Sequence, residues 1–429
     1  MNKEVTGTSA LQGTITLPPD KSISHRSAMF AALAEGESVI ENYSQAADPQ
    51  STLSCLRQLG IEIQADGSGT VVVQGAGIGG FREPSEVLDC GNSGTTMRLM
   101  SGMVAGAGIN VTLDGDASLR SRTMKRVIDP LQEMGALISG RDDNYAPLQI
   151  SSGGRIRGFR YPLPIASAQL KSAVLLAGLY GEEPTEVVET IPSRDHTERL
   201  LQLPSESFGT GIVIRSSRSH LVPQQNYRVP GDFSAAAFWL VAGAIHPNSE
   251  IVLHDVGLNP SRTAALLILQ EMGADIEIEK SDTAGPEPMG RVTVRSSGLR
   301  AISLDPALIP NCIDELPIIM IAMSFAEGRS EIAGAGELRH KETDRLRAMS
   351  NLLETAGERF EVSESGILIH GRGNHRPEPG IFESEHDHRI AMSAAVMGLM
   401  ADGTSSVLNA ECTSISYPGF WSDLELLSQ

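Results

Sequence analysis

Residues 339–347 are dense in charge and place the carboxylates of Glu342 and Asp344 among one lysine and three arginines. If a helix began there, Lys341 and Arg345 would be i,i+4 neighbours, and Glu342 and Arg345 would be i,i+3 neighbours. A glutamate held in this way is either a partner in an exposed ion pair, which is common, or an acid–base group. The segment is therefore a candidate for anion binding and proton transfer.

Lysines, arginines and hydroxyl groups recur at other expected helix starts, where free backbone N–H groups favour anions. Residues 20–26 place Ser22 at the expected N-cap and Arg26 one turn later. Lys21 opposes the helix dipole and therefore needs a negative partner. Residues 90–98 add glycines that permit close approach of the backbone to a ligand, although a tight turn explains them equally well. Both segments are candidate anion sites.

The densest group of cations lies in residues 119–126, where four basic side chains fall within seven positions. On a chain of net charge −19, such a loop is expected to concentrate a small anionic ligand. Further donors suited to a phosphate or carboxylate are Ser167, Gln169, Ser193, Arg194, His388 and Arg389.

The acidic composition argues against nucleic acid or an anionic membrane as a partner, because these partners need a broad basic surface. The four cysteines are scattered without a CxxC pair, so neither a zinc site nor a disulfide framework is expected. A metal at His386 and His388 is the weaker alternative, because Arg389 would repel a cation. The longest apolar run, residues 235–245, is too short to span a membrane, and we expect a cytoplasmic protein.

The elements that would position these residues follow an internal repeat. The sequence Gln-Glu-Met-Gly-Ala occurs at 132–136 and again at 270–274, each time closing an amphipathic helix before an expected strand. Alanine-rich helices such as 172–179 and 392–400 are apolar nearly all round and are expected to be buried. Their polar starts, 71, 74, 67, 80 and 74 residues apart, lie near Ser22, Ser93, Ser167, Ser234, Asp314 and His388.

Six units of helix, strand, helix and strand would make two similar α/β domains of three units each. We expect one domain at residues 20–231 and the other at residues 1–19 with 232–429, because the division falls between the third and fourth units. The strand before the first unit is expected to pair with the last, truncated unit. A substrate cleft is expected between the domains, where ligands usually bind.

Together these segments resemble the 5-enolpyruvylshikimate-3-phosphate synthase family over essentially the whole chain. The most specific parts are residues 20–26, 92–98, 341–345 and 387–389. The resemblance implies the enolpyruvyl transferase fold, an inside-out α/β barrel. It also implies a transferase, expected to be monomeric, that joins phosphoenolpyruvate to the 5-hydroxyl of shikimate 3-phosphate and releases phosphate. Neither a metal nor an organic cofactor is implied.

The resemblance further implies roles for individual residues. Phosphoenolpyruvate would contact Lys21, Gly94, Arg122, Gln169, Arg345, His388 and Arg389. Shikimate 3-phosphate would contact Lys21, Ser22, Arg26, Ser167, Gln169, Arg194, Asp314 and Lys341. Lys21 would be catalytic, Glu342 would donate the proton to C3 of phosphoenolpyruvate, and Asp314 would be the base for the 5-hydroxyl. Because Lys341 and Arg345 would favour the ionised form of Glu342, we hypothesise that its proton arrives after substrates bind.

Some positions depart from the pattern of many family members. Ile415 stands where many have a lysine, Ala168 where many have a second serine, and Glu337 where many have an asparagine. These departures resemble the second class of the family more than the first. Leu99 stands where the first class commonly has proline, which leaves inhibitor sensitivity open.

Two alternatives share the expected architecture. The UDP-N-acetylglucosamine enolpyruvyl transferases use the same donor, but their loop carries a reactive cysteine that residues 119–126 lack. A non-catalytic or RNA-end-processing protein built from similar repeats is the more distant alternative. The net charge argues against RNA, and Lys21, Asp314 and Glu342 argue against a protein without activity.

Overall fold

The computed structural model describes residues 1–209, 211–282 and 285–429. The chain separates into two compact units. The central unit consists of Pro19–Val229 with Gly285–Glu287, and the terminal unit consists of Met1–Pro18, Pro230–Ala284 and Pro288–Gln429. The sequence analysis assigned residues 285–287 to the other domain. They belong to the central unit because the buried side chains of Glu287 and His196 pair there, with Oε1 and Nδ1 2.8 Å apart.

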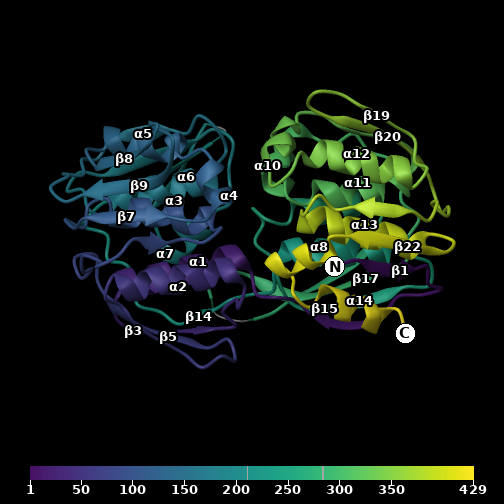
Figure 1. The fold of residues 1–429 in the computed structure, drawn as a ribbon, viewed down its shortest axis with the longest axis horizontal. Helices are drawn as coiled ribbons and strands as arrows, with labels where there is room; N and C mark the ends of the chain where they lie inside the picture. The colour runs from purple at the N-terminus through teal and green to yellow at the C-terminus, as the bar shows by residue number, and fades with distance from the viewer. Residues whose placement is uncertain (210, 283–284) are drawn as a thin grey trace. The chain divides into compact units, whose positions relative to one another are not determined.

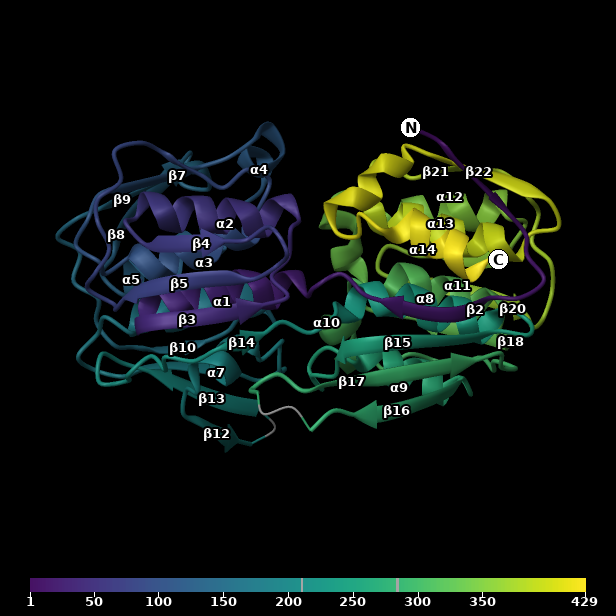
Figure 2. The ribbon, with the colours of Figure 1, turned by 90° about the horizontal axis from the view of Figure 1, so that it is seen from below.

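The described part of the central unit contains three sheets, with strand orders β14-β3-β5-β4, β6-β7-β9-β8 and β10-β11-β13-β12. The strands are β3 (Glu35–Glu41), β4 (Glu62–Ala65), β5 (Val71–Ala76), β6 (Leu88–Asp89), β7 (Val111–Asp114), β8 (Leu137–Arg141), β9 (Tyr145–Ser151), β10 (Arg160–Pro162), β11 (Thr185–Glu189), β12 (Ser205–Phe208), β13 (Gly211–Ser216) and β14 (Tyr227–Arg228). The helices are α1 (Lys21–Leu33), α2 (Ala47–Gln58), α3 (Gly94–Val104), α4 (Ala117–Ser121), α5 (Lys125–Glu133), α6 (Ala168–Gly178) and α7 (His196–Leu201). Figure 2 shows α1 and α2 beside β3, β4 and β5.

The described part of the terminal unit also contains three sheets, with strand orders β16-β17-β15-β2, β18-β20-β19 and β1-β22-β21. The strands are β1 (Lys3–Thr6), β2 (Gln12–Thr16), β15 (Glu250–Gly257), β16 (Asp275–Lys280), β17 (Met289–Arg295), β18 (Glu327–Ile332), β19 (Phe360–Val362), β20 (Ile367–Arg372), β21 (Ile381–Glu383) and β22 (Thr404–Leu408). The α-helices are α8 (Phe233–Ile245), α9 (Ala264–Glu271), α10 (Ile309–Cys312), α11 (Leu316–Ser324), α12 (Arg345–Thr355), α13 (His388–Met400) and α14 (Phe420–Leu427). Three 3-10 helices lie at Pro306–Leu308, Gly336–His340 and Ala410–Ile415.

The sheets repeat one pairing pattern, which confirms the mixed α/β repeat. In each four-stranded sheet one edge strand pairs in parallel and the other two pairs are antiparallel. The N-terminal strand β1 pairs antiparallel with β22 of the last unit, as predicted. A second N-terminal strand that was not predicted, β2, lies directly before the first unit and pairs in parallel with β15 of the fourth unit (Figure 2).

Apolar helices form the core of each unit, as their sequences predict. Every residue of α8 is buried, and α11 and α13 pack against it and against each other (Figure 1). In the central unit α3 packs on α6 so closely that a Cβ atom at Gly102 would lie 2.1 Å from the carbonyl oxygen of Ala173. Glycine at that position therefore permits the contact between the two helices.

Two helix starts differ from the predicted ones. Ser22 is not the N-cap of α1, because Asp20 holds that position and its carboxylate accepts the N–H of Ile23 at 2.8 Å. Lys341 and Arg345 are not helical neighbours, because a 3-10 helix ends at His340 and α12 begins only at Arg345. Asp344 caps α12 by accepting the N–H of Arg347 at 3.0 Å.

Among the described residues, no single helix is both long enough and apolar enough to cross a membrane. Pro306–Cys312 and Leu316–Ser324 meet the length and composition test only as a pair, and that pair is bent by 120°.

Candidate active site

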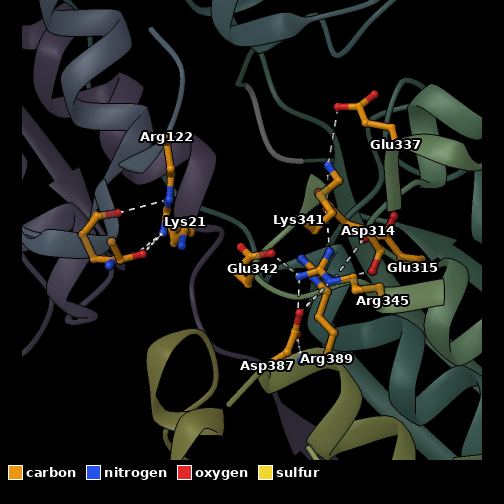
Figure 3. A network of polar contacts seen from close by, with 12 residues as sticks. Lys21, Arg122, Asp314, Glu315, Glu337, Lys341, Glu342, Arg345, Asp387 and Arg389 are labelled. Carbon is orange, nitrogen blue, oxygen red and sulfur yellow. Dashed lines mark hydrogen bonds and ion pairs between the residues drawn. The ribbon is translucent and has the colours of Figure 1, made fainter. Parts of the chain in front are cut away.

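Arg345 is the centre of a charged cluster in the terminal unit (Figure 3). It is the first residue of α12 and is 1% exposed. Its Nε lies 2.8 Å from Asp387 Oδ2, its Nη2 lies 2.6 Å from Glu342 Oε2, and its Nη1 lies 3.4 Å from Asp314 Oδ1. One guanidinium therefore holds three carboxylates from three segments of the chain.

Asp314 is positioned by three cations. Besides Arg345, Lys341 Nζ lies 3.6 Å from its carboxylate, and Arg389 Nη1 donates to its backbone oxygen at 2.8 Å. The expected pairing of Lys341 with Glu342 is wrong. Lys341 turns instead towards Asp314 and towards Glu337, at 4.0 Å, because the chain between the 3-10 helix and α12 is not helical.

The cluster determines the protonation of its members. The side chain of Glu342 is 44% exposed. Its partial burial raises its pKa, but Arg345 and His388 together outweigh this effect and lower the pKa to about 2. Burial, assisted by the neighbouring Arg389, lowers the pKa of His388 to about 4. At neutral pH, Glu342 is therefore a carboxylate and His388 is a neutral imidazole.

The central unit carries a second, cation-rich cluster (Figure 3). Lys21 Nζ lies 2.7 Å from Asp48 Oδ2, so the predicted negative partner of Lys21 is a residue of α2. Arg122 Nη2 donates to Asn92 Oδ1 at 2.6 Å, and no carboxylate lies within 4 Å of this guanidinium in the part of the chain that the structure describes. An anion near Arg122 would meet an uncompensated positive charge.

Arg98 belongs with these residues, and the sequence analysis did not assign it a site role. Its guanidinium is buried, donates to Gln169 Oε1 at 2.7 Å, and has no carboxylate within 4 Å among the described residues. Burial lowers its pKa to about 9, and Arg126 and Arg122 add to the shift. A Cβ atom at Gly94 would lie 2.9 Å from Arg98 Nη1, so the glycine leaves room for this arginine. The sequence signal was an arginine one turn after a glycine-rich helix start.

The basic loop divides into structural and available cations. Arg120 pairs with Asp114 at 2.5 Å, and Lys125 pairs with Asp129 at 3.0 Å. Two of the four cations of this loop therefore bind acidic neighbours within a few residues, and Arg122, the one assigned to a substrate, is not among them.

Arg26 is a further buried cation of the central unit. It is 3% exposed and donates from Nε to Thr197 Oγ1 at 2.9 Å and from Nη2 to Ser172 Oγ at 3.0 Å. Ser167 caps α6, and Arg194 lies half-buried between β11 and α7. The predicted residues thus fall into two groups, with Asp314, Lys341, Glu342, Arg345, His388 and Arg389 in the terminal unit and Lys21, Ser22, Arg26, Gly94, Arg122, Ser167, Gln169 and Arg194 in the central unit.

His25, one turn after Lys21 in α1, is expected to make the stability of the protein depend on pH. It is fully buried, and burial lowers its pKa to about 3, below the 6.5 of an exposed histidine. As pH falls, His25 therefore takes up a proton in the unfolded chain before it does so in the folded one. The contribution of buried, neutral His25 to the free energy of unfolding is fully present above pH 6.5 and is lost as pH falls towards 3, at about 1.4 kcal/mol per pH unit. His25→Gln should flatten the fall in unfolding free energy measured by urea between about pH 7 and about pH 5. The exposed His370→Gln should leave it unchanged, and equal slopes in all three proteins would contradict the prediction.

No group of three or more His, Cys, Asp or Glu side chains arranged to hold a metal ion occurs in the described ranges.

Comparison with known proteins gives one consistent family. The family model described as EPSP synthase (3-phosphoshikimate 1-carboxyvinyltransferase) matches residues 5–424. Proteins described as 3-phosphoshikimate 1-carboxyvinyltransferase are 52% identical in Salinibacter ruber, over 98% of this chain and 97% of that one, and 47% identical in Geobacillus kaustophilus, over 98% and 99%. The solved EPSP synthase of Acinetobacter baumannii superposes with a TM-score of 0.90 at 39% identity, covering 99% of this chain and 98% of that one. An enolpyruvyl transferase of Streptomyces tendae shares the fold, with a TM-score of 0.77 at 16% identity over 99% and 96% of the two chains.

Proposed function

Because the chain belongs to the EPSP synthase (3-phosphoshikimate 1-carboxyvinyltransferase) family, we propose how its residues divide the work of that reaction. The protein is a transferase that moves the enolpyruvyl group of phosphoenolpyruvate to the 5-hydroxyl of shikimate 3-phosphate and releases phosphate. This is a step of the shikimate pathway to the aromatic amino acids. The observation that carries the assignment of roles is the single buried Arg345 that holds both Glu342 and Asp314.

We propose that the central unit supplies most of the positive charge for the two anionic substrates. Its Lys21, Gly94, Arg122 and Gln169 would bind phosphoenolpyruvate, and its Lys21, Ser22, Arg26, Ser167, Gln169 and Arg194 would bind shikimate 3-phosphate. The absence of a carboxylate beside Arg122, Arg98 and Arg26, among the described residues, supports this role. A buried guanidinium without an ionic partner is stabilised when a phosphate or carboxylate binds to it.

The terminal unit would supply the acid and the base. Glu342 would give a proton to C3 of phosphoenolpyruvate, which leaves C2 open to attack by the 5-hydroxyl oxygen while Asp314 takes the hydroxyl proton. In the second half, C3 would return a proton to Glu342 as the C2–O bond to phosphate breaks and the double bond forms again, and the proton that Asp314 took from the hydroxyl would leave with the released phosphate. Lys341 would bind shikimate 3-phosphate, and Arg345, His388 and Arg389 would bind the phosphoenolpyruvate carboxylate and phosphate.

The proton of Glu342 must arrive with the substrates. A pKa of about 2 leaves the free enzyme without a proton on this carboxylate at neutral pH. A substrate anion bound to Arg345 would weaken the pair between Arg345 and Glu342 and would itself repel the Glu342 charge. Both effects raise the pKa of Glu342, so we propose that substrate binding loads the acid.

The remaining features are proposed from the family resemblance. We propose a cytoplasmic monomer without a metal or organic cofactor, whose two domains are the compact units, which lie close to the expected bounds 20–231 and 1–19 with 232–429 apart from residues 285–287. Turnover would need both units, because the central unit would supply the positive charge and the terminal unit would supply the carboxylates.

Phosphate release from phosphoenolpyruvate tests the proposed substrates. We expect release with shikimate 3-phosphate and none with UDP-N-acetylglucosamine, because residues 119–126 contain no cysteine. Release with the second acceptor alone would identify the other class of enolpyruvyl transferase. No release with either would contradict the function.

A further inference from the structure

Lys171 is a fully buried lysine of α6 that the roles above leave unused. Its Nζ lies 2.8 Å from Glu189 Oε2, at the end of β11, and 2.7 Å from Glu198 Oε1, in α7. The lysine is 0% exposed, and the carboxylates are 1% and 12% exposed. One ammonium group therefore joins α6, β11 and α7, and it faces two negative charges.

The same three elements hold the groups around Arg26. Ser172, the residue after Lys171, and Thr197, the residue before Glu198, accept from the Arg26 guanidinium, and their own oxygens lie 2.6 Å apart. Glu189 accepts from the backbone N–H and the hydroxyl of Ser193, directly before Arg194. Lys171 is thus linked to the surroundings of two of the four cations assigned to shikimate 3-phosphate, Arg26 and Arg194.

Among the described residues, Arg26 donates only to neutral groups, although Glu198 is next to Thr197 in sequence. Its donors reach two hydroxyls and the backbone oxygen of Ser22. The second oxygen of Glu198, Oε2, is buried and has no hydrogen-bond partner. Burial raises the pKa of Glu198, and Lys171 opposes that shift. Burial lowers the pKa of Arg26 to about 10, and the charge of Glu198 is the largest influence that opposes this shift. Without Lys171, the carboxylate of Glu198 would lose its ionic partner, and Arg26, which already binds the adjacent Thr197, would be available to pair with it.

We propose that Lys171 is a positioning residue for the shikimate 3-phosphate site, which prevents Glu198 from neutralising Arg26 and fixes the α6 and α7 hydroxyls that orient the Arg26 guanidinium. The proposal rests on the proposed assignment of Arg26 to that substrate. Without the lysine, two buried carboxylates share one neighbouring guanidinium, and the anionic group of the ligand must compete with Glu198 for Arg26.

Steady-state kinetics of Lys171→Met and of Lys171→Met with Glu198→Gln test this. The single variant should raise KM for shikimate 3-phosphate by about tenfold or more, since a charge-assisted contact to the ligand is lost. Its kcat at saturation and its KM for phosphoenolpyruvate should change far less. The double variant should recover most of the affinity, because it removes the competing charge without rebuilding any contact. Lys3→Met, which removes a half-buried lysine that pairs with Glu425 away from the assigned residues, is the control and should leave every constant unchanged.

Three results would overturn the proposal: an unchanged KM for shikimate 3-phosphate in the single variant, an equal rise for both substrates, or no recovery in the double variant. If the single variant does not fold, Glu198→Gln alone decides. It should bind shikimate 3-phosphate at least as tightly as the wild type in calorimetry, and weaker binding would contradict the proposal. Each constant is measured against active wild-type enzyme, so a wild type inactive with shikimate 3-phosphate would instead contradict the assigned function.

Discussion

Replacing Glu342 by Gln is expected to lower kcat by about 10²- to 10⁴-fold, the usual contribution of a positioned acid or base. The amide keeps the shape of the side chain and its acceptor oxygen for Arg345, so both KM values should change little. What it loses is the ability to carry a proton to C3. Turnover is measured as phosphate release with shikimate 3-phosphate.

Hydrogen exchange at C3 separates this role from a structural one. In heavy water the wild type should place deuterium on C3 of phosphoenolpyruvate or of the product, because the proton added there is later removed. Glu342→Gln should lose this exchange in proportion to turnover. Glu354→Gln, an exposed change on α12, should alter neither measurement. Near-normal turnover or undiminished exchange in Glu342→Gln would contradict the assignment.

Arg345→Met is expected to destabilise the protein by about 3–5 kcal/mol, as removal of one partner from a buried ion pair does. Asp387 is 0% exposed, and among the described residues its ion pair is with Arg345, whose Nε lies 2.8 Å away. Without Arg345, the Asp387 carboxylate would either stay charged without this partner or take up a proton, and both outcomes cost free energy. Activity should be lost as well, since Glu342 and Asp314 would no longer be held. Urea unfolding and phosphate release measure the two effects.

A second substitution tests the cause of that loss. Adding Asp387→Asn to Arg345→Met removes the uncompensated charge and should recover part of the stability but none of the activity. Arg347→Met, whose side chain is 60% exposed and paired with Glu385, should cost only about 0–1 kcal/mol. Equal destabilisation by Arg345→Met and Arg347→Met would contradict this account of the buried cluster.

The sequence predicted features that depend on short spacings. The repeated helix starts and the buried apolar helices follow from periodicity and helix-end signals, and the structure confirms the buried helices. The pairing of β1 with the last unit was inferred differently, from the count of repeats, which leaves an N-terminal strand outside the first unit. The capping residue of α1 was predicted wrongly, because Asp20 and Ser22 are both good caps and only the backbone path selects between them. The start of α12 was misplaced for the same reason, since Asp344 caps a helix that was expected to begin earlier.

Partners distant in sequence were beyond such reasoning. Asp48 meets Lys21 across 27 residues, between two helices of the first repeat, and Asp387 meets Arg345 across 42 residues, where the fifth and sixth repeats meet. The buried contacts of Lys171 span 18 and 27 residues. A charged residue in an alanine-rich helix shows only that a partner must exist, because the free energy of burying a lone charge is prohibitive.

The pairing of β1 with β22 also determines the order in which parts of the chain can fold during synthesis. The central unit is encoded without interruption from Pro19 to Val229, apart from Gly285–Glu287, so nearly all of it can pack while the ribosome is still translating the later repeats. The sheet that contains β1 cannot close until Thr404–Leu408 has emerged. The first strand of the chain is thus among the last to find its partner, and the terminal unit is the part that depends on the nascent chain staying free of premature contacts.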